Sequence, residues 1–301
     1  MDEQRAMLGV IAGSIKIIIG AGNDAKSEFV RTEKTNLTTP FGSPSEPFIE
    51  TKLRTGETVV LLNRHGEGHL LGPSAINYRA NVWGMKKLGV THLLSICAVG
   101  SLEPHIKPGK TLLIPDQLFD WTKGARKHTF FDGQDDVVAH YGFADPICAD
   151  FSATVAAACG TLIDEFNIAH EKSTPLVIIE GPTFSTRAES RFFRETLHAV
   201  AVGMTALPEA RLAREAGLCY AVLCLPTDYD SWRAAEKGVE SIEIAKTIKT
   251  FAKVPIAIIP YLARKLRDES CSCRVSFASA VASDLSKIDL KKMREYEIFE
   301  R

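Results

Sequence analysis

Short apolar runs alternate along the chain with longer segments in which apolar residues recur at helical spacing. The runs are rich in Val, Ile and Leu and are mostly closed by glycine or proline, which is typical of buried β-strands. These predicted strands are Leu8–Ala12, Val59–Asn63, Leu93–Ala98, Thr111–Pro115, Leu176–Glu180, Val200–Met204 and Tyr220–Leu225. A further apolar run, Ile15–Ile19, does not indicate either structure by its pattern alone.

The segments with helical spacing lie between these runs. They are Ser74–Leu88, Ala149–Phe166, Ala188–Leu197, Pro208–Ala216 and Val239–Ala252. Pro208 suits the first turn of a helix and Gly217 suits a helix end. The alternation predicts an α/β fold with a central mixed or mostly parallel sheet flanked by helices. Because ligands collect at the carboxyl ends of strands in such sheets, the loops after the apolar runs are the first places to search for chemistry.

The chain contains no internal repeat and no Pro/Ser-rich linker. We therefore expect one domain over residues 1–267. From about Arg264 onward, lysines and arginines alternate with acidic residues. This change predicts a C-terminal helix and tail, residues 268–301, packed on the domain.

Composition narrows the class of protein. Hydrophobic residues make up 45% and charged residues 24% of the 301 positions, which is ordinary for a globular protein and excludes a disordered or fibrous one. The 36 basic and 37 acidic residues give a formal net charge of −1. Without a basic excess or a long Lys/Arg block, we expect no nucleic-acid partner and no anionic membrane partner. A small anionic substrate stays possible, because it needs only a local cradle of donors.

The most apolar N-terminal stretch, Met7–Gly22, contains Lys16 and several glycines and follows Asp2 and Glu3. A signal peptide needs a basic start and a membrane helix needs a longer apolar run, so we expect neither. The expected compartment is the cytoplasm, with the nucleus as an open alternative.

Seven cysteines, an odd number without a secretory signal, predict reduced thiols. None has histidines at the spacing of a zinc finger. Cys271-Ser-Cys273 is the only tight local cluster. We interpret it as two surface thiols on the tail, with a strained local disulfide or an adventitious metal site as alternatives.

Several loops after the predicted strands carry residues suited to anions. Gly13-Ser14 offers close backbone approach and a hydroxyl group, although an ordinary turn explains it equally well. The nearby Gly20-Ala-Gly22 lacks the third glycine of a dinucleotide fingerprint, because Ala25 stands there. Arg64-His65-Gly66 offers a guanidinium fork suited to phosphate or carboxylate. The turn at Cys97–Ser101 can hold an anion or a sugar hydroxyl, or serve structure alone.

Two later loops carry residues suited to a flat polar ring. In Glu180–Glu189, Phe184 can stack on a ring and Ser185 supplies a hydroxyl, while Thr186 and Glu189 fit a helix capping box. In Thr227-Asp-Tyr-Asp230, two carboxylates can accept hydrogen bonds from ring N–H or amino groups, and one with a raised pKa can donate a proton. A solvated acidic turn or a metal site without nearby histidine are the alternatives.

Taken in order, these motifs resemble the methylthioadenosine phosphorylase branch of the trimeric purine nucleoside phosphorylases. The resemblance extends from about Leu8 to the tail. It includes Gly9–Ser14, Thr39–Gly42, Arg64–Gly66, Asn77–Asn81, Gly100–Leu102, Asp116-Gln117, Glu180–Pro182, Phe184-Ser185, Arg187–Ser190, Met204-Thr205, Pro208-Glu209, Arg214–Gly217 and Thr227–Asp230.

The resemblance implies a nucleoside phosphorylase-like α/β fold and a catalytic domain over residues 1–267. It implies phosphorolysis of a 6-aminopurine nucleoside, with 5′-methylthioadenosine and phosphate giving adenine and 5-methylthioribose 1-phosphate. It also implies a homotrimer, inorganic phosphate as co-substrate, and no metal or organic cofactor.

Residue roles follow by the same resemblance. Asp228 is the expected proton donor or hydrogen-bond partner at purine N7, and Asp230 the acceptor for the 6-amino group. The phosphate-binding positions are Ser14, Arg64, His65, Cys97, Ala98 and Thr205. The nucleoside-binding positions are Phe184, Ser185, Met204, Thr227, Ser241, Ala245 and His140, the last lent by the neighbouring subunit.

The chain departs from the family pattern at several of these places. Ala12 and Ile15 replace glycines of the first turn, Cys97 replaces a threonine, and Thr183 replaces an arginine. Ser241 and Ala245 imply a wider, more polar 5′ pocket than the family builds for a methylthio group. Three alternatives therefore stay open: a phosphorylase for 6-oxopurines, a weakened nucleoside-binding paralogue, and a nucleosidase that uses water. The 5′ preference and the choice between trimer and hexamer also stay open.

Overall fold

The computed structural model describes residues 6–13, 27–132, 137–233, 239–267 and 271–289. Nine strands form one sheet in the order β2-β3-β4-β1-β5-β8-β7-β6-β9. Their bounds are β1 Leu8–Ala12, β2 Phe29–Thr35, β3 Phe48–Leu53, β4 Thr58–Asn63, β5 His92–Ser101, β6 Thr111–Trp121, β7 Asn167–Ile179, β8 Ala201–Gly203 and β9 Cys219–Asp228. All seven strands expected from the apolar runs are present, and β5, β6, β7 and β9 extend further than their apolar runs.

The sheet is mixed, as the sequence predicted. Parallel pairing joins β4, β1, β5 and β9 in turn, and also β6, β7 and β8. Antiparallel pairing joins β2 to β3, β3 to β4, β5 to β8, and β6 to β9. Because β9 pairs with both β6 and β5, the strands β5, β8, β7, β6 and β9 close on themselves.

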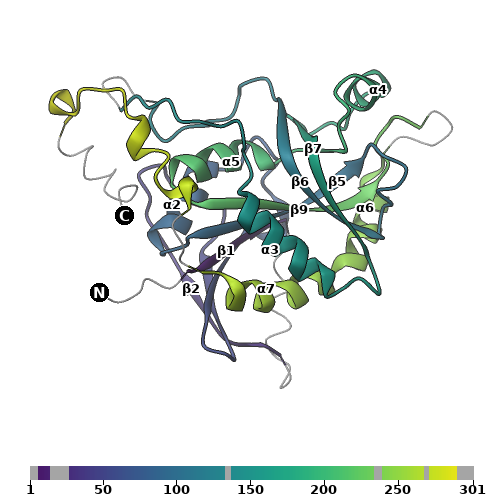
Figure 1. Ribbon diagram of the computed structural model, residues 1–301, viewed down its shortest axis with the longest axis horizontal. Coiled ribbons are helices and arrows are strands. Elements are labelled where there is room, and N and C mark those ends of the chain that lie inside the picture. The colour runs from purple at the N-terminus through teal and green to yellow at the C-terminus, as the bar shows by residue number, and fades with distance from the viewer. Residues whose placement is uncertain (1–5, 14–26, 133–136, 234–238, 268–270, 290–301) are drawn as a thin grey trace.

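Helices flank the sheet (Figure 1). The α-helices are α2 Tyr78–Lys87, α3 Ala149–Gly160, α4 Arg187–Glu195, α5 Ala206–Glu215, α6 Ser241–Ile248 and α7 Lys253–Lys265. Helix α3 packs on α7 and α2 packs on α5. Leu207 has extended backbone angles, so the regular part of α5 starts at Pro208, where the sequence placed a helix start. The expected capping box between Thr186 and Glu189 is present at the start of α4.

Three elements were not expected from the sequence. Strand β2 is exposed at nearly every position, and its polar sequence gives no apolar run. In strand β3, which pairs with β2, the three polar residues Glu50–Lys52 interrupt the apolar residues and leave no continuous apolar run. Helix α7 contains Pro255 and Pro260, which argue against a helix, yet it buries Val254, Ile258, Ile259 and Leu262.

The described part of the expected C-terminal helix is a chain of turns. Residues 271–289 contain the 3₁₀ helices η4 Ser272–Arg274, η5 Ala278–Ala280 and η6 Leu285–Lys287. Within this segment, Cys273 and Phe277 are buried in the hydrophobic core. The interpretation of Cys271 and Cys273 as two surface thiols was wrong, because Cys273 is buried and Cys271 is only half-exposed. None of the helices in the described ranges is both long enough and apolar enough to span a bilayer.

The strand register brings the ends of distant segments together. Ala12 is paired with Asn63 of β4 and Ile96 of β5, so Arg64, which follows β4, lies close to β5. Further along β5, Gly100 is paired with Asp228 at the end of β9. Antiparallel β8 places Val202 opposite Gly100, which directs Met204 and Thr205 back toward Cys97. One strand, β5, thus underlies most of the residues expected to carry chemistry.

Candidate active site

The residues expected to carry chemistry lie along β5, and a buried ion pair lies at one end of this region. Arg64 directly follows β4, and its Nε donates to Oε1 of Glu209 at 2.5 Å. Its Nη2 also donates to Ser95 Oγ at 2.7 Å and to the Ile11 carbonyl at 3.1 Å, and Nη1 donates to the Ile96 carbonyl at 3.1 Å. Burial lowers the pKa of Arg64, but the Glu209 carboxylate outweighs that effect, so the guanidinium stays charged. Among the described residues, one Nη1 hydrogen is left to reach a ligand.

Glu209 is a site residue that the sequence analysis quoted but gave no role. It is completely buried in the first turns of α5 and also accepts from Ser95 Oγ at 2.7 Å and Tyr220 Oη at 3.3 Å. The available signal was a lone carboxylate in Ala206–Ala213, where every other residue except Arg211 is apolar. A carboxylate that deep in a core needs a charged partner, and Arg64 supplies it.

His65 is held by the chain that follows it. Its Nδ1 lies 2.8 Å from the Leu71 carbonyl, so Nδ1 carries the proton, and its ring stacks on His69. Burial and the adjacent Arg64 charge lower the pKa of His65 to about 4. The Cδ2 edge of the ring faces Gly13 at the end of β1. The neutral ring therefore presents Nε2 as a hydrogen-bond acceptor.

Cys97 and Thr205 meet beside this pair. Cys97 Sγ lies 3.3 Å from Thr205 Oγ1 and 3.3 Å from Ser95 Oγ. The next residue, Ala98, is exposed although its neighbours on β5 are buried. An exposed residue within a central strand marks an opening in the surface of the sheet at that point.

Met204 lies between the two ends of the region. Gly181 has a φ of 67°, which favours glycine, and a Cβ there would stand 2.7 Å from Met204 Sδ, so the two residues approach closely. Buried Arg126, which the sequence analysis did not single out, donates to the carbonyls of Met204, Leu207 and Glu180. Arg126 thereby fixes the segments after β7 and β8 relative to each other.

The second end of the region contains Asp228. Its Oδ2 accepts from Thr227 Oγ1 at 2.8 Å, and its Oδ1 accepts from the Asp230 amide at 2.8 Å. Burial raises the pKa of Asp228 above its ordinary value, and the nearby Asp230 charge adds to this effect. A Cβ on Gly100 would stand 3.0 Å from Asp228 Oδ1, so the glycine allows the loop to approach β5 closely.

Asp230 lies in a pocket of hydroxyl groups. Burial raises its pKa, and the nearby Ser190 and Ser185 hydroxyls partly offset that effect. Yet Asp230 Oδ2, Ser185 Oγ and Ser190 Oγ are buried without a hydrogen-bond partner of good geometry among the described residues. Buried polar atoms normally find partners, so three such atoms in one place suit a polar ligand.

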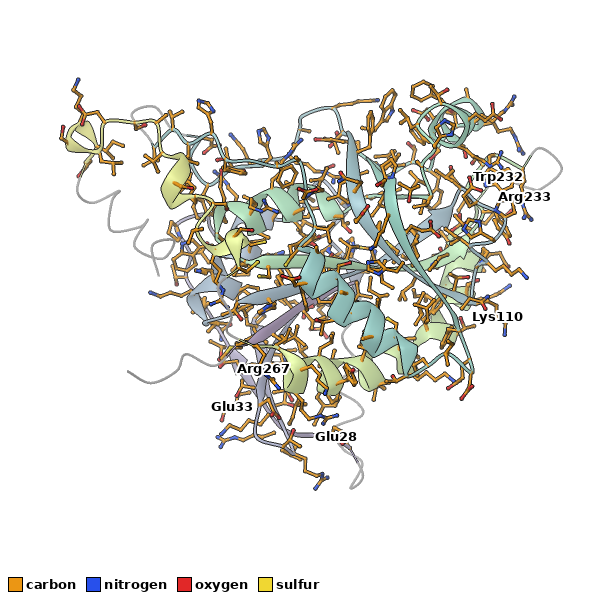
Figure 2. All side chains as sticks on the ribbon, in the orientation of Figure 1. Glu28, Glu33, Lys110, Trp232, Arg233 and Arg267 are labelled. Carbon is orange, nitrogen blue, oxygen red and sulfur yellow. The ribbon has the colours of Figure 1, made fainter. Side chains whose placement is uncertain are left out.

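The loop after Asp230 is fixed by an aromatic side chain. Trp232 Nε1 donates to the Ser101 carbonyl at 3.0 Å, and the Arg194 guanidinium lies 4.5 Å from the centre of its ring. Figure 2 shows Trp232 and Arg233 together at the edge of the molecule next to α4. These contacts hold the end of β9 against β5.

The remaining predicted residues lie at the rim or elsewhere. Phe184 is 37% exposed, and Ser241 and Ala245 are exposed on α6, which packs beside β9. His140 is exposed, and its amide donates to the Ala280 carbonyl at 2.9 Å. Ser14 and Ile15 lie outside the described residues.

The two ends of the region are a short way apart along one strand. Cys97 marks the Arg64 end and Gly100 the Asp228 end, and three strand residues span about 10 Å. The site thus offers cationic and hydroxyl donors at one end and two carboxyl groups of raised pKa at the other.

Comparison with known proteins adds to this geometry. The model of the phosphorylase superfamily matches residues 15–261. The S-methyl-5′-thioadenosine phosphorylase of Geobacter sulfurreducens is 42% identical over 283 residues, 94% of this chain and 93% of that protein. The enzyme of the same name from Saccharolobus solfataricus is 40% identical over 270 residues, 89% of this chain and 97% of that protein.

Solved structures of methylthioadenosine phosphorylases are also similar to this chain. A methylthioadenosine phosphorylase from an antarctic soil metagenomic library superposes with a TM-score of 0.85 at 33% identity, covering 99% of both chains. The Schistosoma mansoni methylthioadenosine phosphorylase in complex with adenine superposes with a TM-score of 0.77 at 29% identity, covering 98% of both chains.

Proposed function

This chain belongs to the phosphorylase superfamily, and on that basis we propose that it catalyses the phosphorolysis of 5′-methylthioadenosine to adenine and 5-methylthioribose 1-phosphate. The single observation that carries the proposal within this chain is the polarity of the site. An arginine and a threonine hydroxyl lie at one end of a short stretch of β5, and two carboxyl groups lie at the other. A nucleoside with phosphate below its sugar fits this polarity, because the anionic phosphate faces the donors and the purine faces the carboxyl groups.

At the phosphate end, the Arg64 guanidinium, the Thr205 hydroxyl and the Ala98 amide supply donors for phosphate oxygens. His65 is neutral because burial and the Arg64 charge lower its pKa, so its Nε2 accepts from the hydroxyl of hydrogenphosphate. Glu209 balances the Arg64 charge and fixes the guanidinium plane. A phosphate oxygen then attacks the anomeric carbon as the bond to the purine breaks.

At the base end, the leaving purine gains negative charge that must be relieved. Burial raises the pKa of Asp228, so a larger fraction of this carboxyl carries a proton that it can donate to N7. Buried Asp230 accepts from the 6-amino group, with the Ser185 and Ser190 hydroxyls beside it. A carboxylate acceptor favours a 6-amino over a 6-oxo purine. Phe184 at the rim stacks on the ring, and Met204 packs on the ribose.

The 5′ end of the nucleoside lies toward α6, where Ser241 and Ala245 are exposed in the single chain. The exposed position of His140 suits donation to the site of a second copy, in a homotrimer. The reaction needs phosphate as co-substrate and no metal or organic cofactor. The cytoplasm is the compartment in which this salvage reaction would act.

One assay tests the proposal. Purified protein is incubated with 5′-methylthioadenosine, with and without phosphate, and released adenine is measured by chromatography. We expect adenine and 5-methylthioribose 1-phosphate in equal amounts, and release only with phosphate. Equal release without phosphate would assign a hydrolytic nucleosidase, and release of hypoxanthine from inosine at a greater rate would assign a 6-oxopurine enzyme. Either result overturns the proposal.

A further inference from the structure

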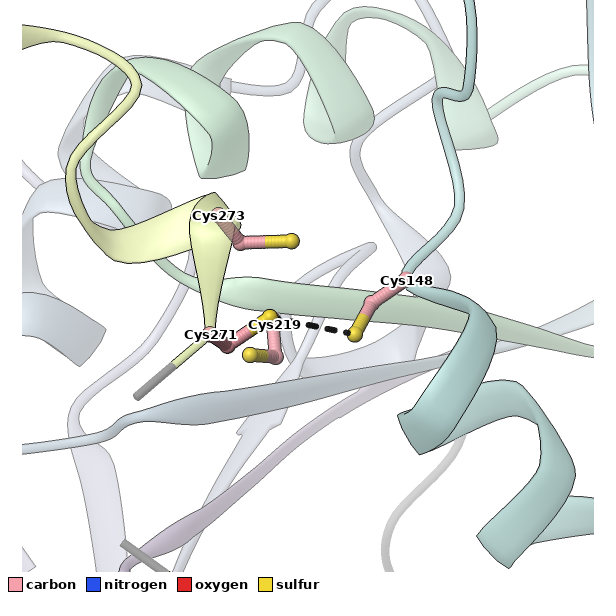
Figure 3. A group of neighbouring side chains, drawn as sticks. All are labelled: Cys148, Cys219, Cys271 and Cys273. Carbon is pink, nitrogen blue, oxygen red and sulfur yellow. Dashed lines mark hydrogen bonds between the residues drawn. The ribbon is translucent and has the colours of Figure 1, made fainter. Parts of the chain in front are cut away.

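Four cysteine side chains from three distant segments converge on one small space (Figure 3). Cys148 is the N-cap residue of α3, Cys219 is the first residue of β9, Cys271 is the N-cap residue of η4, and Cys273 lies within η4. Their four Sγ atoms all lie within 4.8 Å of one another. Only Cys271 and Cys273 are neighbours in the sequence, which gives no sign that Cys148 and Cys219 lie beside them.

The spacing of the sulfur atoms suits a tetrahedral metal centre. Zinc–thiolate bonds of about 2.3 Å place the four sulfurs of a tetrahedral site about 3.8 Å apart. Cys148 Sγ lies 3.8 Å from Cys271 Sγ, and no other pair of the four exceeds 4.8 Å. A disulfide needs about 2 Å between sulfurs. All seven cysteines are described, and all are free thiols.

We propose that Cys148, Cys219, Cys271 and Cys273 together bind one Zn²⁺ ion in a structural tetrathiolate site. Binding releases the four thiol protons to solvent and forms four Zn–S bonds, so the centre carries two net negative charges. No electron transfer is involved. Thiolate ligands select a soft or borderline divalent cation over Mg²⁺ or Ca²⁺.

The surroundings suit a centre with that charge. Cys148 lies at the N-cap of α3, where the positive end of the helix dipole favours a thiolate. Lys86 lies near Cys219 and near Arg274, which directly follows Cys273 in the chain. Two basic side chains are thus close enough to balance the negative charge of the bound centre.

Burial and position indicate a structural role. Cys148, Cys219 and Cys273 are buried, whereas Cys271 is half-exposed and gives an entry path for the ion. Cys219 and Asp228 are at opposite ends of β9, about 30 Å apart along a ten-residue strand. Ser276 Oγ donates to the Arg214 carbonyl at 3.3 Å beside the cluster. The ion would therefore fasten the segment around η4 to the start of α3 and the start of β9, independently of the proposed function.

Metal content tests the proposal directly. The untagged full-length chain is produced with zinc in the medium, purified under reducing conditions without chelator, and examined by elemental analysis and native mass spectrometry. We expect one zinc per chain in the wild type and less than a tenth of that in the Cys271→Ser/Cys273→Ser double variant. Cys159→Ala removes a buried thiol outside the cluster, so it should retain the ion.

Cobalt supplies a readout that does not depend on folding of a variant. Apo wild-type protein titrated with Co²⁺ should show thiolate-to-cobalt charge-transfer bands and intense tetrahedral ligand-field bands that saturate at one ion per chain. Absence of these bands, or wild-type protein without stoichiometric zinc, overturns the proposal. So does a wild-type mass lower by two hydrogens for each disulfide mapped within the four cysteines.

Discussion

Arg64 and Glu209 form an ion pair whose two side chains are each 1% exposed, with Arg64 Nε 2.5 Å from Glu209 Oε1. The two residues come from the end of β4 and the start of α5, 145 positions apart. Because both side chains are buried, water cannot solvate either charge if its partner is removed. The pair therefore links the phosphate end of the site to the stability of the whole fold.

Replacing Glu209 by Gln should destabilise the protein strongly. The substitution leaves the Arg64 charge buried without its carboxylate, which costs about 3–5 kcal/mol in comparable pairs. Urea denaturation measures the free energy of unfolding. Glu243→Gln removes one partner of the exposed Lys246–Glu243 pair and should cost less than about 1 kcal/mol. A Glu209→Gln variant as stable as the Glu243→Gln control would contradict the role given to this pair.

Asp228→Asn should lower turnover of 6-aminopurine nucleosides by about 100-fold, because an amide cannot donate a proton to N7. The fold should persist, since Asn still accepts from either the Thr227 hydroxyl or the Asp230 amide. Steady-state kinetics with 5′-methylthioadenosine give kcat, and circular dichroism melting checks the fold. Asp284→Asn, at the exposed start of η6, is the matched control and should keep wild-type kcat. Unchanged turnover in Asp228→Asn would remove this carboxyl from the chemistry.

Glu215 should make stability fall as pH rises toward neutrality. Its carboxyl accepts from Thr129 Oγ1 at 2.6 Å and from the Phe130 amide at 2.8 Å, yet burial raises its pKa from 4.5 to about 7. Between these two values the folded state holds a proton that the unfolded state has lost. Stability is therefore greatest below about 4.5, falls through this window, and stops falling above about 7.

The Glu215→Gln variant isolates this effect. Its stability relative to wild type should rise by roughly 3 kcal/mol from pH 4.5 to pH 7.5, because 2.5 pKa units correspond to about that free energy. Urea titrations at several pH values measure the difference. Glu195→Gln, an exposed position on α4, should run parallel to wild type. Parallel curves for Glu215→Gln and wild type would show that Glu215 does not titrate in this window.

The sequence predicted the sheet well where strands are buried on both faces. Leu8–Ala12 is apolar at every position, and β1 has those same bounds with all five residues buried. Strand β2 lies at the edge and exposes Val30, so its polar residues give no comparable signal. Helix α7 was not predicted, because two prolines interrupt its apolar pattern. Packing against α3 nevertheless stabilises this helix.

The site was predictable in its parts but not in its internal partners. Cys97 and Thr205 were both expected at phosphate, and the antiparallel register of β8 places them 3.3 Å apart. Glu209 and Arg126 contact groups far away in sequence, so only the folded arrangement identifies their partners. The four-cysteine cluster could not be predicted from the sequence either, because its members come from three distant segments.

Cys97→Thr should strengthen phosphate binding. Cys97 Sγ is a weak hydrogen-bond group beside Thr205 Oγ1, and a threonine hydroxyl there adds a stronger donor to the phosphate end. One hydrogen bond of ordinary strength lowers the KM for phosphate roughly two- to tenfold. Kinetics with varied phosphate at saturating nucleoside measure this value. Cys97→Ser supplies the hydroxyl without the extra methyl group and should show the same direction, while Cys97→Ala removes the polar atom and should not. A phosphate KM that is equal in the Thr, Ser and Ala variants would mean that the side chain at position 97 does not contact phosphate.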